Sequence, residues 1–242
     1  MPSRTEIDPL LVDALLQRER IILSARLLPG VVHNLSGAVQ MMSLPLDLAQ
    51  LALDRGEVDS MGARLQSVRQ GLDRLVNEVG LLAARSRYGQ GRGAEPLDLA
   101  TLAGEQLDFW RCDLFVKHEL ALKRELSPGL GWAKAAPADV ALALNLVVAN
   151  AVEAVQGSGQ PWLAVRNLKQ EGWLSLEVSD SGPGPSAEMA DLLFEPFAGD
   201  KGGGHQGLGL FLAAKALEPW GGRVEIREQV PHTTFAISLP AG

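Results

Sequence analysis

The stretch Gly202-Gly203-Gly204-His205-Gln206-Gly207-Leu208-Gly209-Leu210-Phe211 joins a glycine-rich loop to the start of an apolar segment. Five glycines in eight residues disfavour helix and strand alike, because glycine loses the most backbone entropy on ordering. Residues 210–217 are apolar, rich in alanine and helical in pattern. A glycine loop that opens a helix presents backbone N–H groups and a positive dipole end to an anion. The stretch therefore indicates either a phosphate cradle or a flexible loop that precedes a helix.

Length and composition narrow the class of protein. The 242 residues are enough for one large or two small domains, and the net charge of −7 argues against a nucleic-acid surface. The sequence has no apolar run of about 18 residues and no signal-peptide layout at its start. Cys112 is the only cysteine, which excludes an intrachain disulfide and a CxxC metal site. We expect a cytoplasmic protein without membrane insertion and without a nucleic-acid partner.

The first third of the sequence predicts a helical hairpin. Apolar residues recur at alternating spacings of four and three in two stripes: Leu28, Val32, Leu35, Val39, Met42, Leu46, Ala49 and Leu53, then Met61, Leu65, Val68, Leu72, Leu75, Val79 and Leu82. Residues 54–59 supply a polar turn and an N-cap. Two such helices cannot cover their own apolar faces, so we expect a homodimer through the hairpin, as a four-helix bundle. The alternative is that the rest of the chain covers the stripe.

The remainder has a mixed pattern. Residues 97–110 and 137–155 are typical of helices, and the segments that are typical of strands are 118–126, 162–167, 173–179, 224–227 and 233–239. A glycine-rich, polar segment precedes this region. We therefore predict a helical domain over residues 1–86, a linker over 87–96 and an α+β two-layer sandwich over 97–242, with helices on one face of the sheet.

Polar residues interrupt the apolar pattern of the second region at three places. Asn145 and Asn150 lie in the apolar helix, where a buried amide without a partner costs about 1–3 kcal/mol. Residues 180–184, Asp-Ser-Gly-Pro-Gly, follow a strand, so the glycines let backbone approach a flat ligand while the carboxylate accepts a hydrogen bond from an exocyclic amine. Residues 193–197 form an aromatic turn ahead of the glycine loop. This order and spacing favour one ligand site.

In this order the motifs resemble the boxes of a two-component histidine kinase, whose Bergerat-type ATP-binding fold is shared with the gyrase, Hsp90 and MutL ATPases. Asn150-Ala151 resembles the N box, residues 180–184 the G1 box, residues 194–197 (Phe-Glu-Pro-Phe) the F box, and residues 207–210 (Gly-Leu-Gly-Leu) the G2 box. The hairpin with His33 resembles the dimerisation and phosphoacceptor domain. The resemblance covers nearly the whole chain and implies an all-α hairpin followed by an α+β sandwich of the Bergerat type.

The resemblance implies a soluble histidine kinase with ATP and Mg²⁺. Asn150 would ligate Mg²⁺, Asp180 would accept a hydrogen bond from the adenine amino group, and Gly182 and Gly184 would let the backbone close on the base. The other nucleotide-binding residues implied are Phe194, Lys201, Gly207, Leu208 and Gly209, with Lys201 on the terminal phosphates. His33 would attack the γ-phosphate and pass the phosphoryl group to an aspartate of a response-regulator receiver domain. The chain carries no recognisable sensor domain, so a separate sensor protein is a further expected partner.

Two residues depart from the family pattern. Asn34 follows His33 where the family usually carries an acidic catalytic base, and an amide cannot accept a proton. Leu146 stands four residues before Asn150, where the family usually has a polar residue; Asn145 is one place off, about 100° around the helix. These departures keep open a histidine phosphotransferase relay that is phosphorylated on His33 by another protein. A further alternative is an ATP-binding regulator or serine kinase of the anti-sigma-factor type, against which the dimerising hairpin argues.

Overall fold

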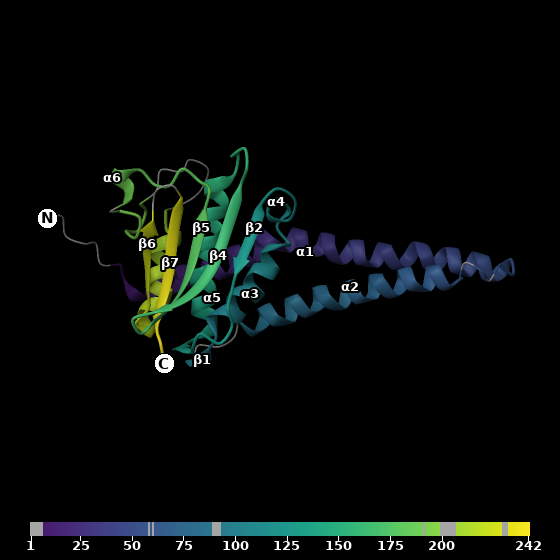
Figure 1. The fold of residues 1–242 in the computed structure, drawn as a ribbon, viewed down its shortest axis with the longest axis horizontal. Coiled ribbons are helices and arrows are strands. Elements are labelled where there is room, and N and C mark those ends of the chain that lie inside the picture. The colour runs from purple at the N-terminus through teal and green to yellow at the C-terminus, as the bar shows by residue number, and fades with distance from the viewer. Residues whose placement is uncertain are drawn as a thin grey trace.

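The computed structural model describes residues 7–57, 59, 61–88, 93–190, 192–198, 207–228 and 232–242. Its first two elements, α1 (Pro9–Asp54) and α2 (Met61–Arg87), form the predicted helical hairpin, which projects from the body of the molecule (Figure 1). The carboxylate of Asp8 caps α1 by accepting a hydrogen bond from the Leu10 N–H at 2.9 Å. Such a cap satisfies one of the donors that a helix start leaves unpaired.

The rest of the chain forms a two-layer body, here called the sandwich. Its elements are β1 (Glu95–Leu97), α3 (Leu99–Trp110), α4 (Leu114–His118), β2 (Ala121–Glu125), β3 (Ala133–Ala135), α5 (Pro137–Val155), β4 (Trp162–Gln170), β5 (Trp173–Asp180), α6 (Ala187–Ala190), α7 (Gly209–Leu217), the 3-10 helix η1 (Glu218–Trp220), β6 (Arg223–Glu228) and β7 (Thr233–Pro240). In the described residues the main sheet has the order β2-β4-β5-β7-β6, with β2 and β4 parallel and the other pairs antiparallel. Helices α3, α5 and α7 form the second layer, which confirms the predicted sandwich (Figure 1).

Helix α5 is the centre of the core. It packs on α7 and on the sheet, and its Leu144, Val147 and Val152 are fully buried. By length and composition α5 could also cross a membrane, but 78% of its apolar window is buried inside the sandwich. That burial accounts for its composition, because a core helix needs apolar residues on every face.

Two predicted element boundaries differ from the structure because of helix caps. His118 ends α4 and the strand starts only at Ala121, because the carboxylate of Asp113 accepts hydrogen bonds from Phe115 and Val116 and so starts a helix. The predicted helix over 97–110 begins at Leu99, since Asp98 caps it in the same way. The three-residue strands β1 and β3 were too short to predict. Strand β1 takes up Glu95 and Pro96, the end of the predicted linker, and residues 89–92 lie outside the described part; the domain boundaries remain a prediction.

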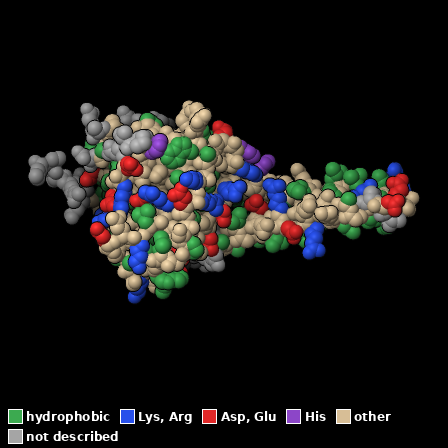
Figure 2. All heavy atoms as spheres, in the orientation of Figure 1, with side chains coloured by type: hydrophobic (Ala, Val, Ile, Leu, Met, Phe, Trp, Pro, Cys, Tyr) green, Lys and Arg blue, Asp and Glu red, His purple; other side chains and the backbone are tan. Residues whose placement is uncertain are grey.

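The two predicted apolar stripes of the hairpin are exposed at eight of their fifteen positions. Their members that are 47–58% exposed are Leu28, Val32, Val39, Leu46, Leu53, Leu65, Leu72 and Val79, and hydrophobic side chains are visible along the projecting hairpin (Figure 2). The buried face of α1 is instead formed by Leu23, Leu27, Val31, Asn34 and Ala38. Val32 therefore lies outside the buried face of α1, and the alternative that the rest of the chain covers the stripe does not hold for its exposed members.

The sandwich covers a different face of α1 and approaches it closely at Gly30. A Cβ atom built on Gly30 would lie 1.6 Å from the carbonyl oxygen of Cys112, in the connection between α3 and α4. Only a residue without a side chain permits this contact between the two backbones. Gly30 therefore fixes where the sandwich lies along the hairpin.

Candidate nucleotide site

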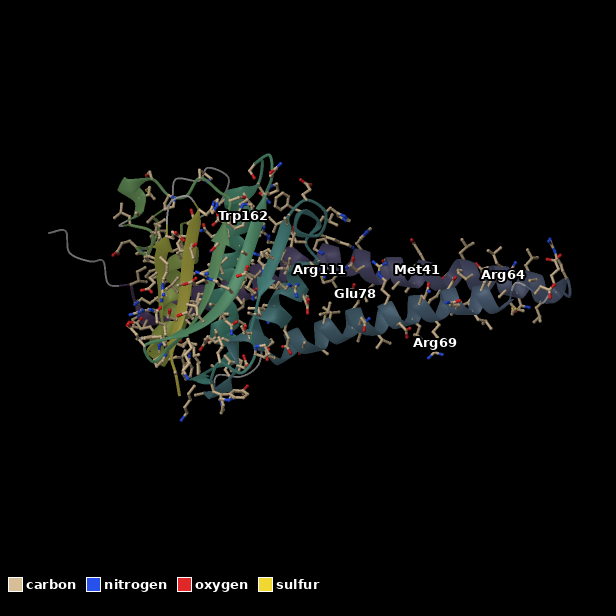
Figure 3. All side chains as sticks on the ribbon, in the orientation of Figure 1. Met41, Arg64, Arg69, Glu78, Arg111 and Trp162 are labelled. Carbon is tan, nitrogen blue, oxygen red and sulfur yellow. The ribbon has the colours of Figure 1, made fainter. Side chains whose placement is uncertain are left out.

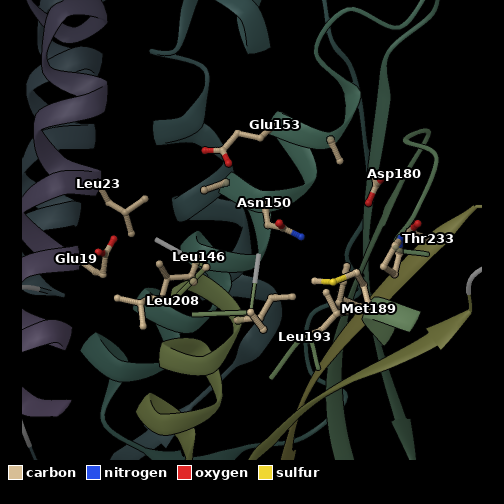
Figure 4. Close-up of a pocket in the computed structure, with 18 of the residues that line it drawn as sticks. Glu19, Leu23, Leu146, Asn150, Glu153, Asp180, Met189, Leu193, Leu208 and Thr233 are labelled. Atoms are coloured by element: carbon tan, nitrogen blue, oxygen red, sulfur yellow. The ribbon is translucent and has the colours of Figure 1, made fainter. Parts of the chain in front are cut away.

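The residues of the predicted motifs line a cavity of about 740 Å³ between the second layer, the ends of β5 and β7, and α1. Figure 4 shows Asn150 and Glu153 of α5 in the middle of this cavity, Asp180 and Thr233 on one side, and Glu19 and Leu23 of α1 on the other. The size falls within the range of about 300–1,000 Å³ that is typical of small-molecule sites. The cavity walls therefore unite segments from distant parts of the chain.

Helix α5 presents Asn150 and Leu146 to the cavity and turns Asn145 away from it. Asn145 is buried, accepts a hydrogen bond from Trp110 Nε1 at 2.8 Å and donates one to Gln106 Oε1 at 2.9 Å. The partner that a buried amide requires is thus structural for Asn145. Leu146 stands where a polar residue was expected, so this turn of the wall is apolar.

Asp180, the last residue of β5, has its side chain buried against the cavity, with the residue 1% exposed. One of its carboxylate oxygens accepts a hydrogen bond from the Gly182 N–H at 2.8 Å, which fixes the carboxylate. A Cβ on Gly182 would lie 2.9 Å from the Ala154 side chain, and Gly182 does not line the cavity. Gly182 therefore serves the packing of this loop on α5, whereas Gly184, with φ of 71°, does line the cavity, as predicted.

The end of the glycine-rich stretch forms the cavity wall at the start of α7. Gly207 has a φ of 61°, Gly209 is the first residue of α7, and both line the cavity with the buried Leu208 between them. This is the predicted junction of glycine loop and helix start, where N–H groups are available to an anion. Lys201 and His205 lie outside the described residues.

Phe194 does not line this cavity. It contributes to a second groove, together with Phe211 of α7 and Trp220, while its neighbour Leu193 contacts the first cavity. The aromatic turn thus supports the site through Leu193, and the structure gives no nucleotide contact to Phe194 itself.

Five residues of α1 that were not predicted from the sequence also line the cavity: Arg18, Glu19, Ile22, Leu23 and Arg26. Their spacing of three and four places them on one helix face, which is the signal that could have revealed them. Burial raises the pKa of Glu19, and the guanidinium of Arg18, 3.8 Å away, partly offsets that increase. The hairpin therefore supplies one wall of the site.

The predicted phosphoacceptor lies elsewhere on α1. His33 is exposed and is not among the cavity-lining residues. Asn34 beside it is buried, accepts a hydrogen bond from Lys117 Nζ at 2.8 Å and donates one through Nδ2 to Glu78 Oε2 at 3.4 Å. Glu78 lies near the point where the hairpin leaves the sandwich (Figure 3). His33 is seven residues beyond Arg26, which corresponds to about 10 Å along a helix. The structure thus separates His33 and Asn34 from the nucleotide motifs.

The oxygen ligands that the cavity offers fit Mg²⁺ only when the phosphates of a nucleotide complete its coordination. Within the described ranges no group of three or more His, Cys, Asp or Glu side chains could hold a metal ion. Mg²⁺ in nucleotide sites takes one or two protein oxygens, several waters and the substrate phosphates. The amide oxygen of Asn150 is a suitable ligand of this kind, so Asn150 would hold the ion together with the nucleotide.

Comparison with known proteins finds a family of ATPases that matches the second part of the chain. Residues 135–242 match the family model of the histidine kinase-, DNA gyrase B- and HSP90-like ATPases. The C4-dicarboxylate transport sensor protein DctB of Rhizobium meliloti (strain 1021) is 26% identical over 228 residues, which is 93% of this chain and 36% of that protein. The sensory histidine kinase/phosphatase NtrB of Rhodobacter capsulatus is 37% identical over 108 residues, 40% of this chain and 30% of NtrB. Residues 135–242 therefore belong to this ATPase family, and the chain is related to sensor histidine kinases.

Solved structures agree with the fold. The catalytic domain of histidine kinase ThkA superposes with a TM-score of 0.54 at 22% identity, over 61% of this chain and 95% of that domain. The structure of full-length ShkA superposes with a TM-score of 0.52 at 17% identity. The match covers 98% of this chain and 46% of the ShkA chain. The chain spans 36% of the length of DctB and 48% of the length of the sensor histidine kinase ZraS of Escherichia coli (strain K12).

Proposed function

We propose that this chain is an ATP-dependent protein histidine kinase that phosphorylates itself on His33. The observation that carries the proposal is that Asn150, Asp180, Gly184, Gly207 and Gly209 line one cavity. Their order along the chain is that of the N, G1 and G2 boxes, and the relatives ZraS and NtrB are named as histidine kinases. In support, the related fold of ShkA was solved in complex with AMPPNP.

In this proposal the nucleotide lies across the cavity from β5 to α7. The fixed carboxylate of Asp180 accepts a hydrogen bond from the adenine amino group, and Met189, Leu193 and Leu208 provide apolar contact for the base. The N–H groups at Gly207 and Gly209 face the phosphates. Mg²⁺, held by Asn150 and the phosphates, would supply neutralisation of the charge that develops on the transferred group.

The transfer itself is an in-line displacement by the imidazole of His33. A nitrogen–phosphorus bond forms as the bond between the γ-phosphorus and the bridging oxygen breaks, and ADP leaves with the electron pair. A receiver-domain aspartate of a response regulator then accepts the phosphoryl group. Asn34 cannot take up the imidazole proton, so the exposed His33 releases it to solvent.

The expected partners follow from the same proposal. The exposed stripe that includes Val39, Leu46, Leu65 and Leu72 fits a homodimer in which two hairpins form a four-helix bundle, because exposed apolar stripes of this kind are buried in association. A response regulator and a separate sensor protein are the further partners, and the cytoplasm is the proposed location.

A second candidate function is a histidine phosphotransferase relay. Two observations favour it: Asn34 is engaged by Lys117 instead of serving as a base, and the turn of α5 that precedes Asn150 is the apolar Leu146. In this role His33 would exchange a phosphoryl group with receiver domains, and bound nucleotide would not be the donor.

Incubation with γ-labelled ATP and Mg²⁺ tests the proposal, with acid-labile label on the protein as the readout. For a kinase, label appears on the unaltered chain and on His118→Gln, the matched control, and is lost in His33→Gln. Nucleotide binding without label, combined with labelling of His33 by a phosphorylated receiver domain, would reject the kinase in favour of the relay.

A further inference from the structure

Helix α1 brings two arginines, Arg18 and Arg26, into the wall of the nucleotide cavity, and three contacts hold Arg26 there. Arg26 Nη1 lies 2.9 Å from Glu153 Oε1, and Arg26 Nε lies 3.7 Å from Asp113 Oδ2. The guanidinium also stacks over the ring of Trp110, 5.2 Å from the ring centroid. A planar cation that is held by two carboxylates and an aromatic face has little freedom to move.

The charge of Arg26 is important because it neutralises the carboxylate of Glu153. Glu153 lies three residues after Asn150, so both residues face the cavity from neighbouring turns of α5 (Figure 4). The side chains of Arg26 and Glu153 are only 25% and 21% exposed, so water screens their charges weakly. Without a neutralising cation, the carboxylate of Glu153 would repel nucleotide phosphates that bind near Asn150.

We infer that Arg26 is a nucleotide-binding residue, which neutralises Glu153 and so lets the cavity accept the triphosphate of ATP. The inference rests on the proposed function, because it concerns the nucleotide bound in that same cavity. It gives the helix of the phosphoacceptor a second role, since the segment seven residues before His33 completes the charge balance of the ATP site. Neither Arg26 nor Glu153 is part of the four boxes that identify the fold.

The position of Arg26 depends on how α1 lies against the sandwich. Leu23 and Leu27 are buried beside it, and one turn further the absence of a side chain at Gly30 admits the Cys112 carbonyl. Movement of α1 away from the sandwich would withdraw Arg26 and leave Glu153 exposed to the phosphates. ATP binding and docking of α1 are therefore linked, so that each favours the other.

The chain provides a matched control for this charge. Arg20 precedes Arg26 by less than two turns of the same helix and forms an ion pair with Asp139 at 2.5 Å. Arg20 lines the second groove and not the nucleotide cavity. Removal of Arg20 therefore weakens docking of α1 without a change in the charge of the nucleotide cavity.

The test is calorimetric titration of the whole chain with Mg-ATP and, separately, with uncharged adenosine. For Arg26→Gln we expect Mg-ATP affinity to fall on the order of tenfold and adenosine affinity to change less than about twofold, because only the phosphates feel the lost charge. The double variant Arg26→Gln/Glu153→Gln should recover most of the Mg-ATP affinity. Arg20→Gln should leave the ratio of the two affinities unchanged.

Several results would overturn the inference. They are an unchanged Mg-ATP affinity in Arg26→Gln, an equal loss for adenosine, and an equal loss of Mg-ATP affinity in Arg20→Gln. A loss in the single variant Glu153→Gln would also overturn it, because Glu153 would then be a ligand of the nucleotide complex. This last variant removes no packed arginine, so it serves if Arg26→Gln does not fold. Failure of the unaltered chain to bind Mg-ATP would instead overturn the proposed function.

Discussion

The substitution Gly30→Ala should separate two opposite effects on stability. In the interior of an isolated helix, alanine is about 1 kcal/mol more favourable than glycine. In this molecule the new Cβ would lie 1.6 Å from the carbonyl oxygen of Cys112, and an ordinary contact begins at 3.4 Å. The two backbones would have to separate by 1.8 Å, the difference of these distances. Neither atom belongs to a flexible side chain, so the clash cannot be relieved locally.

The expected magnitude follows from what the separation exposes. Leu27 and Val31 flank Gly30 on the buried face of α1 and are 1% and 3% exposed. Overpacking of a tight contact costs about 1–3 kcal/mol and sometimes more, and full exposure of one such side chain costs about 1.5–3 kcal/mol. The two costs together are about 2.5–6 kcal/mol, so after subtraction of about 1 kcal/mol for helix propensity we expect Gly30→Ala to lower the free energy of unfolding by about 1.5–5 kcal/mol.

Urea unfolding measures this effect, with tryptophan fluorescence as the probe because Trp110 lies beside the α1 contact through Arg26. Gly37→Ala is the matched control: it lies on the same helix and its Cβ would meet nothing within 4 Å. The control should be more stable than the unaltered chain by about 0.5–1 kcal/mol. A Gly30→Ala chain that is as stable as the Gly37→Ala chain would refute the docking of the sandwich at Gly30.

Three further substitutions test the site and the hairpin. Asp180→Asn keeps an oxygen for the Gly182 N–H but places an amide before the adenine amino group; we expect ATP affinity to fall at least tenfold by titration, with the unfolding midpoint nearly unchanged. Burial raises the pKa of Glu19 in the folded chain, so the free energy of unfolding falls as the pH rises from about 4.5 through that raised pKa. The Glu19→Gln variant should therefore unfold at a higher temperature than the unaltered chain at about pH 7. This difference in unfolding temperature should vanish near about pH 4. Leu46→Glu places a charge on the exposed stripe and should shift the chain from dimer to monomer in sedimentation, whereas an unchanged dimer would locate the contact elsewhere.

The sequence predicted those parts of the site that depend on local chemistry. A glycine loop before a helix, an acidic residue at a strand end and an amide in an apolar helix each have few physical uses, and they occur in an ordered series. The structure brings Asn150, Asp180, Gly184, Gly207 and Gly209 to one cavity. The main strands and α5 were predictable for a similar reason, since their apolar periodicity is strong.

The parts of the fold and of the site that the sequence did not predict depend on tertiary contacts. Periodicity identified an apolar stripe on α1 but not which side of the helix the sandwich would cover, because Leu23, Leu27 and Val31 are as apolar as Leu28 and Val32. The choice between these faces depends on Gly30, whose contact partner Cys112 is distant in the sequence. The same docking brings Arg26 to the cavity; the spacing of three and four marks the helix face on which Arg26 lies, but not that this face meets the site.

The fixed spacing of Arg26 and His33 constrains how the proposed phosphoryl transfer to His33 could take place. The two residues lie on one helix, separated by about 10 Å, and Arg26 now occupies the α1 wall of the nucleotide cavity. Transfer to His33 of the same chain would need the sandwich to move along α1 by about this distance, which would break the contacts at Gly30 and between Asn34 and Lys117. Transfer to His33 of a partner chain would leave Arg26 opposite Glu153. Mixed dimers of a His33→Gln chain and an Asn150→Ala chain distinguish these routes: label on the Asn150→Ala chain requires transfer between chains, and its absence requires movement of the sandwich along α1.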